Sequence, residues 1–206
     1  MNTLPNLLSA SRLFATILVF VLVLVDQPWA FLTATALFVL ASLTDFFDGY
    51  LARRLKVVSS FGAFLDLTAD KVFVSAVLIA LVQVGLVPAW IVFVIVTREF
   101  LVTSLRSIAA EKGKKIPPSM WGKQKTFITL VAMAVLLLAK GLGAHQLSLF
   151  PLMLTFNSQT VNAAELLLLL SNILLIVAVI WTAFSGIDYT IGALPLFQKE
   201  GNTSKV

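Results

Sequence analysis

Short polar breaks divide the chain into six long apolar stretches, at about residues 8–25, 29–51, 63–84, 88–108, 125–142 and 163–185. Each stretch is close to the roughly 20 apolar residues that an α-helix needs to cross a bilayer. Several breaks are so short that the helices on either side are expected to form antiparallel hairpins. The pattern predicts an all-α integral membrane protein with six transmembrane helices.

Composition supports a membrane protein. The chain has 206 residues, of which 59% are hydrophobic and 12% are charged, whereas a soluble domain carries about 25% charged residues. There is no cysteine, which excludes disulfides, thiolate metal sites and a cysteine nucleophile, and there is one histidine, His145, in an outer loop. The N-terminus lacks the features of a cleaved signal peptide, so the first apolar run is expected to be retained. We expect one membrane-embedded domain over 1–192 and a polar cytoplasmic tail over 193–206.

The distribution of basic residues predicts the orientation. In a six-helix bundle the second and fourth connections and the tail share one side, and they carry Arg53, Arg54, Lys56, Lys112, Lys114, Lys115, Lys123, Lys199 and Lys205. The opposite side carries Lys140. By the positive-inside rule both termini are expected in the cytoplasm, with the protein in the cytoplasmic membrane. The net charge of +5 is then explained by anionic lipid headgroups, and no nucleic-acid partner is expected.

Acidic residues are concentrated in one segment. Four of the ten acids lie between residues 45 and 70: Asp45, Asp48, Asp66 and Asp70. The first two are three residues apart at the cytoplasmic end of the second helix, and the other two are four apart at the start of the third. Residues three or four apart share a helix face, and a short basic loop joins the two helices at one depth. The four carboxylates are therefore predicted to converge on one cavity.

Such a cluster predicts a metal site. Carboxylates packed this closely repel one another, and a divalent cation removes the repulsion. Without cysteine or a nearby histidine the ligands are hard oxygens, which suit Mg²⁺ or Mn²⁺. Four carboxylates can hold two ions about 4 Å apart, as in displacements at phosphorus. Interhelical ion pairing would explain one such acid better than four, and an EF-hand is excluded because "DFFDGY" lacks the alternating ligands.

Small residues flank the acids. Gly49, Ala52 and Gly62 leave room for a flat group to lie against the backbone. Arg53 supplies a planar donor suited to a phosphate or to the edge of a base.

Together these residues spell D-x2-D-G-x2-A-R-x8-G-x3-D-x3-D, from Asp45 to Asp70, which resembles the signature of the CDP-alcohol phosphatidyltransferases. The resemblance implies displacement of CMP from a CDP-linked lipid by an alcohol, in a homodimeric membrane enzyme. It assigns Asp45, Asp48 and Asp66 to the metals, and makes Asp70 both a metal ligand and the acceptor of the hydroxyl proton. The residues implied to line the cytidine diphosphate pocket are Gly49, Ala52, Arg53, Ser59 and Gly62.

Three further segments extend the resemblance over most of residues 5–126. "PNLLSASR", "TREFLVTSLR" and "WGKQKT" are similar to segments of bacterial members of the family that make phosphatidylglycerophosphate. The implied substrates are CDP-diacylglycerol and glycerol 3-phosphate, and the acceptor's phosphate needs cations.

Four basic residues are candidates for this phosphate. Arg98 and Arg106 are eight residues apart on the fourth helix, and Lys123 and Lys125 open the fifth. The alternative for Arg98 is an ion pair with Glu99, and the alternative for the two lysines is contact with lipid headgroups.

Asn6 and Ser9 either reach the nucleotide or cap the first helix. One position departs from the family pattern: Leu67 stands where relatives often have proline, which affects the local geometry of the helix start more than the chemistry.

Other functions remain open at this point. Another family product, such as cardiolipin, phosphatidylserine or an inositol phosphate lipid, would use the same motif. An intramembrane prenyltransferase also has paired aspartate clusters, but with more helices and other spacings. A divalent-metal transporter would predict polar residues through the outer half of the bundle and repeated halves, neither of which the sequence shows.

Overall fold

The computed structural model describes residues 3–55, 60–111, 113, 120–144 and 162–198. Within its helices, the side chains of residues 3–10, 45–55, 60–61, 63–66, 120–121, 123 and 193–198 are not described.

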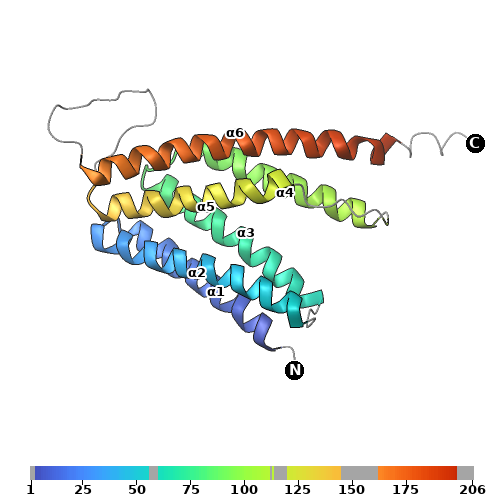
Figure 1. Cartoon of the computed structure of the whole chain (residues 1–206), viewed down its shortest axis with the longest axis horizontal. Coiled ribbons are helices and arrows are strands. Elements are labelled where there is room, and N and C mark those ends of the chain that lie inside the picture. Colours follow the sequence, from blue (N-terminus) through green and yellow to red (C-terminus); the bar gives the residue numbers. More distant parts are fainter. Residues whose placement is uncertain (1–2, 56–59, 112, 114–119, 145–161, 199–206) are drawn as a thin grey trace, which may run out of the picture.

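The described residues form six helices and contain no strand (Figure 1). In chain order they are α1 (Thr3–Leu24), α2 (Pro28–Leu55), α3 (Ser60–Gln83), α4 (Ala89–Glu111), α5 (Met120–Gly141) and α6 (Ala163–Gln198). Each of the six predicted apolar stretches corresponds to one helix, so the all-helical prediction is confirmed. The length of α6 was underestimated more than that of any other helix, because α6 continues past residue 185 to Gln198. The apolar length of a segment indicates how much of it suits a bilayer, but it does not indicate where the helix ends.

Tight turns follow the ends of α1, α3 and α5. Gly85 has φ 72° and Gly143 has φ 84°, values that glycine adopts without a steric cost. After each helix the backbone closes a Schellman motif, in which Leu86 N–H donates to the carbonyl of Leu81 at 2.8 Å and Ala144 N–H donates to that of Ala139 at 3.0 Å. Asp26, with φ 51°, closes the turn between α1 and α2. The turns at Asp26 and Gly85 lie in short breaks, between α1 and α2 and between α3 and α4, where antiparallel hairpins were predicted.

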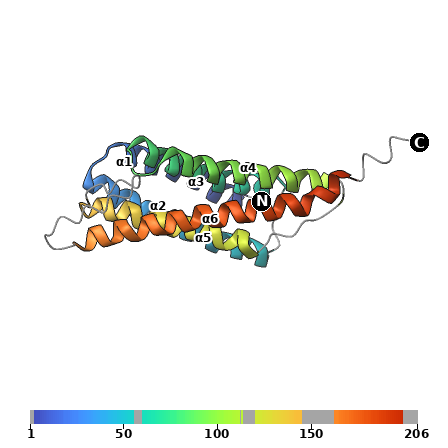
Figure 2. The same ribbon diagram turned by 90° about the horizontal axis from the view of Figure 1, so that it is seen from above.

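The helices run alongside one another as an elongated bundle, and α1 begins and α6 ends in the right half of the view in Figure 1 (Figures 1 and 2). The most extensive packing is between α5 and α6, followed by α1 with α3 and α1 with α2. A close approach joins α2 to α5: a Cβ on Gly141 would lie 2.7 Å from Cδ2 of Leu32. The largest fully buried side chains of the apolar core are Phe31, Phe38, Leu78, Leu81, Ile91, Met133, Leu136, Leu137 and Leu175.

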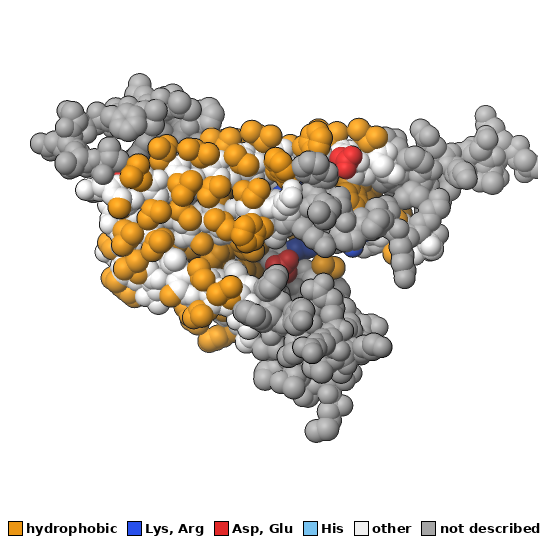
Figure 3. All heavy atoms as spheres, viewed as in Figure 1, with side chains coloured by type: hydrophobic (Ala, Val, Ile, Leu, Met, Phe, Trp, Pro, Cys, Tyr) orange, Lys and Arg blue, Asp and Glu red, His pale blue; other side chains and the backbone are white. Residues whose placement is uncertain are grey.

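Two described stretches, Gln124–Gly141 and Ala163–Gly192, are long and apolar enough to cross a membrane. Shorter apolar helices are present at Ser11–Leu24 and Pro28–Thr44. Hydrophobic side chains are dense in the left half of the face shown in Figure 3, and the charged side chains visible there lie mainly in the right half of that view. On this face the described surface is apolar over long stretches, and its charges are concentrated toward one side.

Candidate functional site

The aspartates of the motif lie where α2 ends and α3 begins. Asp45 and Asp48 are on the helical backbone of α2, and Asp66 is on that of α3, so the predicted spacing on a helix face is realised in the backbone. Their side chains lie outside the described residues. Asp70 is described: it is partly buried on α3 and lines a cavity.

Most of the predicted nucleotide pocket also falls outside the described side chains. This applies to Asn6, Ser9, Gly49, Ala52 and Arg53, which are on helical backbone. Ser59 lies outside the described residues altogether, and Gly62 is a buried residue of α3. These assignments stay predictions.

The cavity beside Asp70 measures about 40 Å³, room for a few water molecules. It lies between α3, α4 and α5, and its lining residues are Asp70, Lys71, Val74, Ser75, Ile95, Val96, Glu99, Lys125, Thr126 and Thr129. Helix packing therefore brings one aspartate of the motif to the same cavity as a predicted phosphate-binding lysine from another helix.

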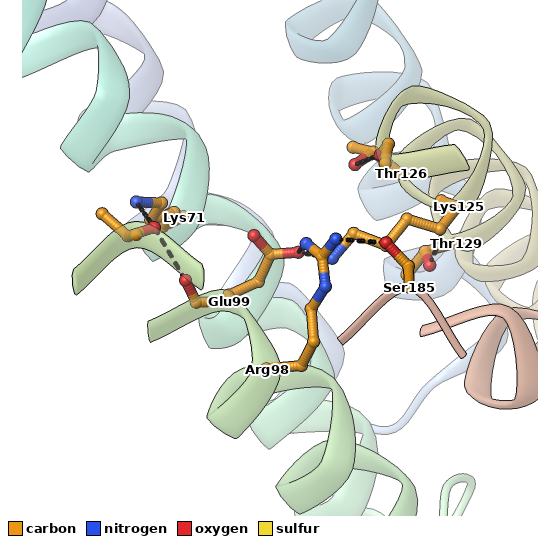
Figure 4. A network of polar contacts seen from close by, with 9 residues as sticks. Lys71, Arg98, Glu99, Lys125, Thr126, Thr129 and Ser185 are labelled. Carbon is orange, nitrogen blue, oxygen red and sulfur yellow. Dashed lines mark hydrogen bonds and ion pairs between the residues drawn. The ribbon is translucent and has the colours of Figure 1, made fainter. Parts of the chain in front are cut away.

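Glu99 is the centre of the polar contacts at this cavity (Figure 4). Its Oε1 accepts a hydrogen bond from Nζ of Lys125 on α5 and lies 3.4 Å from Nη1 of Arg98. Lys125 is 3% exposed and Arg98 is 9% exposed. Removing a cation from water is costly unless a counter-ion is present, so the Glu99 carboxylate makes burial of these two cations possible.

Helix α6 fixes the direction of the Arg98 guanidinium. Nη2 of Arg98 donates a hydrogen bond to Oγ of Ser185 at 2.6 Å, and Ser185 is fully buried. The next residue, Gly186, makes room for the stem of the arginine, because a Cβ there would lie 3.1 Å from Cγ of Arg98. Arg98 is thus held between α4 and α6 with its charged head beside Glu99.

A second lysine is anchored on the α3 side. Lys71 donates to Oγ1 of Thr103 at 2.5 Å, and that hydroxyl donates to the backbone carbonyl of Glu99 at 2.7 Å. Lys71 also interacts electrostatically with Asp70 and with Arg106. Four helices therefore meet in one polar network near the middle of α3 and α4.

The predicted basic residues occupy different places. Arg98 and Lys125 meet at Glu99, which agrees with both the acceptor-site hypothesis and the ion-pair alternative for Arg98. Arg106 is exposed and is not among the cavity-lining residues. Its positive charge repels that of Lys71. The side chain of Lys123 lies outside the described residues.

Sequence reasoning did not assign roles to Lys71, Thr103, Ser185 or Gly186. A signal was available for the first three, since polar or charged residues inside apolar helices are rare unless they have partners or a function. The sequence could not identify the partners, because each contact joins different helices.

A second groove lies between α1 and α2. Its volume is about 230 Å³, and its lining residues are Ser11, Arg12, Ala15, Leu37, Leu40, Ala41 and Thr44. Arg12, the last residue of "PNLLSASR", is 5% exposed there. The groove reaches the residue that precedes Asp45 and so adjoins the motif along α2.

Comparison with known proteins identifies the family. The sequence profile described as CDP-alcohol phosphatidyltransferase matches residues 2–184. A protein of Bacillus subtilis named CDP-diacylglycerol–glycerol-3-phosphate 3-phosphatidyltransferase is 42% identical over 150 residues, covering 67% of this chain and 78% of the relative. Proteins with the same name from Rickettsia bellii and Rickettsia typhi are each 40% identical to this chain. The match to the first covers 66% of this chain and 76% of the relative, and the match to the second covers 69% of this chain and 81% of the relative. The chain belongs to the CDP-alcohol phosphatidyltransferase family.

Proposed function

We propose that this protein is the membrane enzyme that transfers a phosphatidyl group from CDP-diacylglycerol to glycerol 3-phosphate, giving phosphatidylglycerophosphate and CMP. The names of the relatives describe this reaction. The observation that carries the proposal to this chain is the shared cavity: Asp70 of the motif lines the same space as Lys125 and Glu99, and Glu99 contacts Arg98. A proton acceptor and cations for a phosphate are thus close together.

In the proposed reaction, Asp70 accepts the proton of the glycerol hydroxyl. The freed oxygen attacks the phosphorus that carries the diacylglycerol, and the bond from that phosphorus to the oxygen of CMP breaks. The leaving CMP takes the bonding electron pair. Holding the acceptor's phosphate on Arg98 and Lys125 would place its hydroxyl near Asp70, and such positioning reduces the entropic part of the barrier.

Divalent cations complete this site. Asp45, Asp48, Asp66 and Asp70 would hold Mg²⁺ or Mn²⁺, two ions in our proposal. The donor chemistry fits, because the motif supplies carboxylates at helical spacing and no soft ligand. When bound, the ions neutralise the diphosphate and stabilise the departing CMP.

The rest of the pocket follows from the family resemblance. Gly49, Ala52, Arg53, Ser59 and Gly62 are proposed to receive the cytidine diphosphate, with Asn6 and Ser9 close to it. We assign Arg106 and Lys123 to the outer part of the acceptor site. We also propose six membrane crossings, cytoplasmic termini, a site open to the cytoplasmic side and a homodimer.

The test is an assay with purified protein, CDP-diacylglycerol, Mg²⁺ or Mn²⁺, and radiolabelled glycerol 3-phosphate. We expect a lipid-soluble labelled product and one equivalent of CMP. Glycerol, serine and inositol phosphate, supplied in parallel, identify the acceptor. Absence of both labelled lipid and CMP would disprove the proposal, and stronger turnover of another acceptor would correct the substrate.

A further inference from the structure

The contacts of Glu99 raise a question about how an acceptor phosphate binds. The Glu99 carboxylate already accepts a hydrogen bond from Lys125 and forms an ion pair with Arg98 (Figure 4). These are the two buried cations that the proposed acceptor site uses. Glu99 also lines the cavity itself and is 29% exposed. An incoming phosphate and this carboxylate would therefore compete for the same donors.

The charges explain why the carboxylate is needed when no substrate is bound. Lys125 and Arg98 are nearly buried and repel each other, and a buried cation without a counter-ion destabilises the fold. Asp70 and Lys71 line the same cavity and also act on Lys125, so three cations face two carboxylates and one positive charge is left over. One donor of Arg98 also remains unused: its Nε is buried and has no hydrogen-bond partner among the described residues. The site can therefore accept more negative charge and another acceptor oxygen.

We propose that Glu99 is an internal counter-ion that the acceptor's phosphate displaces, and that it thereby restricts the acceptor to phosphorylated alcohols. A phosphate monoester carries about −1.5 to −2 charges and three strong acceptor oxygens. It can take over both cations and the free Nε. A neutral polyol cannot, because releasing Glu99 would leave buried cations without a counter-ion. This inference rests on the proposed function.

The proposal predicts that removing the charge of Glu99 strengthens acceptor binding. In Glu99→Gln the cations have no competing carboxylate, and the repulsion between carboxylate and phosphate is gone. We expect the KM for glycerol 3-phosphate to fall about fivefold, with kcat little changed. Inorganic phosphate, as a competitive inhibitor, should bind more tightly by a similar factor, and glycerol, which no longer has to release a carboxylate, should compete more strongly than it does in wild type.

The matched control is Glu111→Gln, which removes an acidic charge from the exposed end of the same helix. It should leave the KM and the phosphate inhibition constant at the wild-type values. An unchanged or higher KM in Glu99→Gln would overturn the inference, since the carboxylate would then orient the cations for the substrate and not compete with it.

Two variants separate this inference from the proposed function. Arg98→Ala and Lys125→Ala should each raise the KM for glycerol 3-phosphate. If neither does, the proposed acceptor site is wrong. If they do while Glu99→Gln fails to lower the KM, only the role of Glu99 is wrong.

Folding gives an independent measurement. Without a counter-ion, Glu99→Gln should have a lower melting temperature in detergent than wild type, and inorganic phosphate should raise its melting temperature more than that of wild type. If the variant is recovered folded only in phosphate buffer, the inference is supported. If it aggregates with and without phosphate, an anion does not replace the carboxylate and the inference fails.

Discussion

Asp70 is the described member of the aspartate motif, and it lines the cavity that also contains Lys125. We predict that Asp70→Asn lowers kcat by about 10²–10⁴-fold, the usual contribution of a general base, while CDP-lipid binding is largely kept. Binding can be measured by calorimetry in detergent with Mg²⁺ present. Asp26→Asn is the control, because Asp26 closes the α1–α2 turn with φ 51°, a conformation that asparagine tolerates. Equal loss of turnover and binding would show that Asp70 acts mainly as a metal ligand.

Ser185 acts on the site through Arg98, because its Oγ accepts a hydrogen bond from Nη2 of Arg98 at 2.6 Å. Ser185→Ala removes that contact and lets the guanidinium turn away from Glu99. We predict that the KM for glycerol 3-phosphate rises about fivefold while kcat stays close to wild type. Ser171→Ala is the matched control, since Ser171 is also fully buried on α6 but bonds to the carbonyl of Leu168 in its own helix. Equal effects of the two variants would reduce Ser185 to a general packing role.

At the scale of helices, the α2–α5 interface depends on a missing side chain. A Cβ on Gly141 would lie 2.7 Å from Cδ2 of Leu32 and 3.0 Å from its backbone nitrogen. The backbone cannot move aside as a side-chain tip can, so Gly141→Ala should destabilise the protein by about 1–3 kcal/mol, as overpacking does. The measurement is the melting temperature in detergent, which should fall by several degrees.

Gly192→Ala provides the comparison for that variant. A Cβ on Gly192 meets nothing within 4 Å, and alanine favours a helix over glycine by up to about 1 kcal/mol. We expect an equal or higher melting temperature. A similar fall in both variants would mean that the loss in Gly141→Ala does not come from the contact with Leu32.

For the whole molecule, the proposed orientation with cytoplasmic termini can be tested directly. Because the chain has no cysteine, single cysteines can report the orientation directly. Gln27→Cys lies in the α1–α2 turn and Glu111→Cys at the end of α4, and both positions are exposed. With cytoplasmic termini, a membrane-impermeant maleimide should label residue 27 in intact cells and residue 111 only after lysis. The reverse pattern would place the termini outside.

The sequence by itself determined the elements and the motif. Apolar length and the length of the breaks are local features, so the six helices and the short connections between some of them could be predicted. The spacing from Asp45 to Asp70 is also local, and it was sufficient to identify the family. Apolar length was a poorer guide to helix ends, as α6 shows, because a helix can continue beyond the apolar part of its sequence.

Only the tertiary structure decided which helices supply the polar network. Glu99 and Lys125 are 26 residues apart, and Arg98 and Ser185 are 87 apart. Their contacts depend on how far each helix is rotated and shifted against its neighbours, which no local period specifies. For the same reason, the structure places Arg98 and Arg106 differently: Arg98 is buried and Arg106 is exposed. We grouped these two residues because they lie on the same helix. Helix packing gave Arg98 a counter-ion in Glu99 and a fixed direction through Ser185.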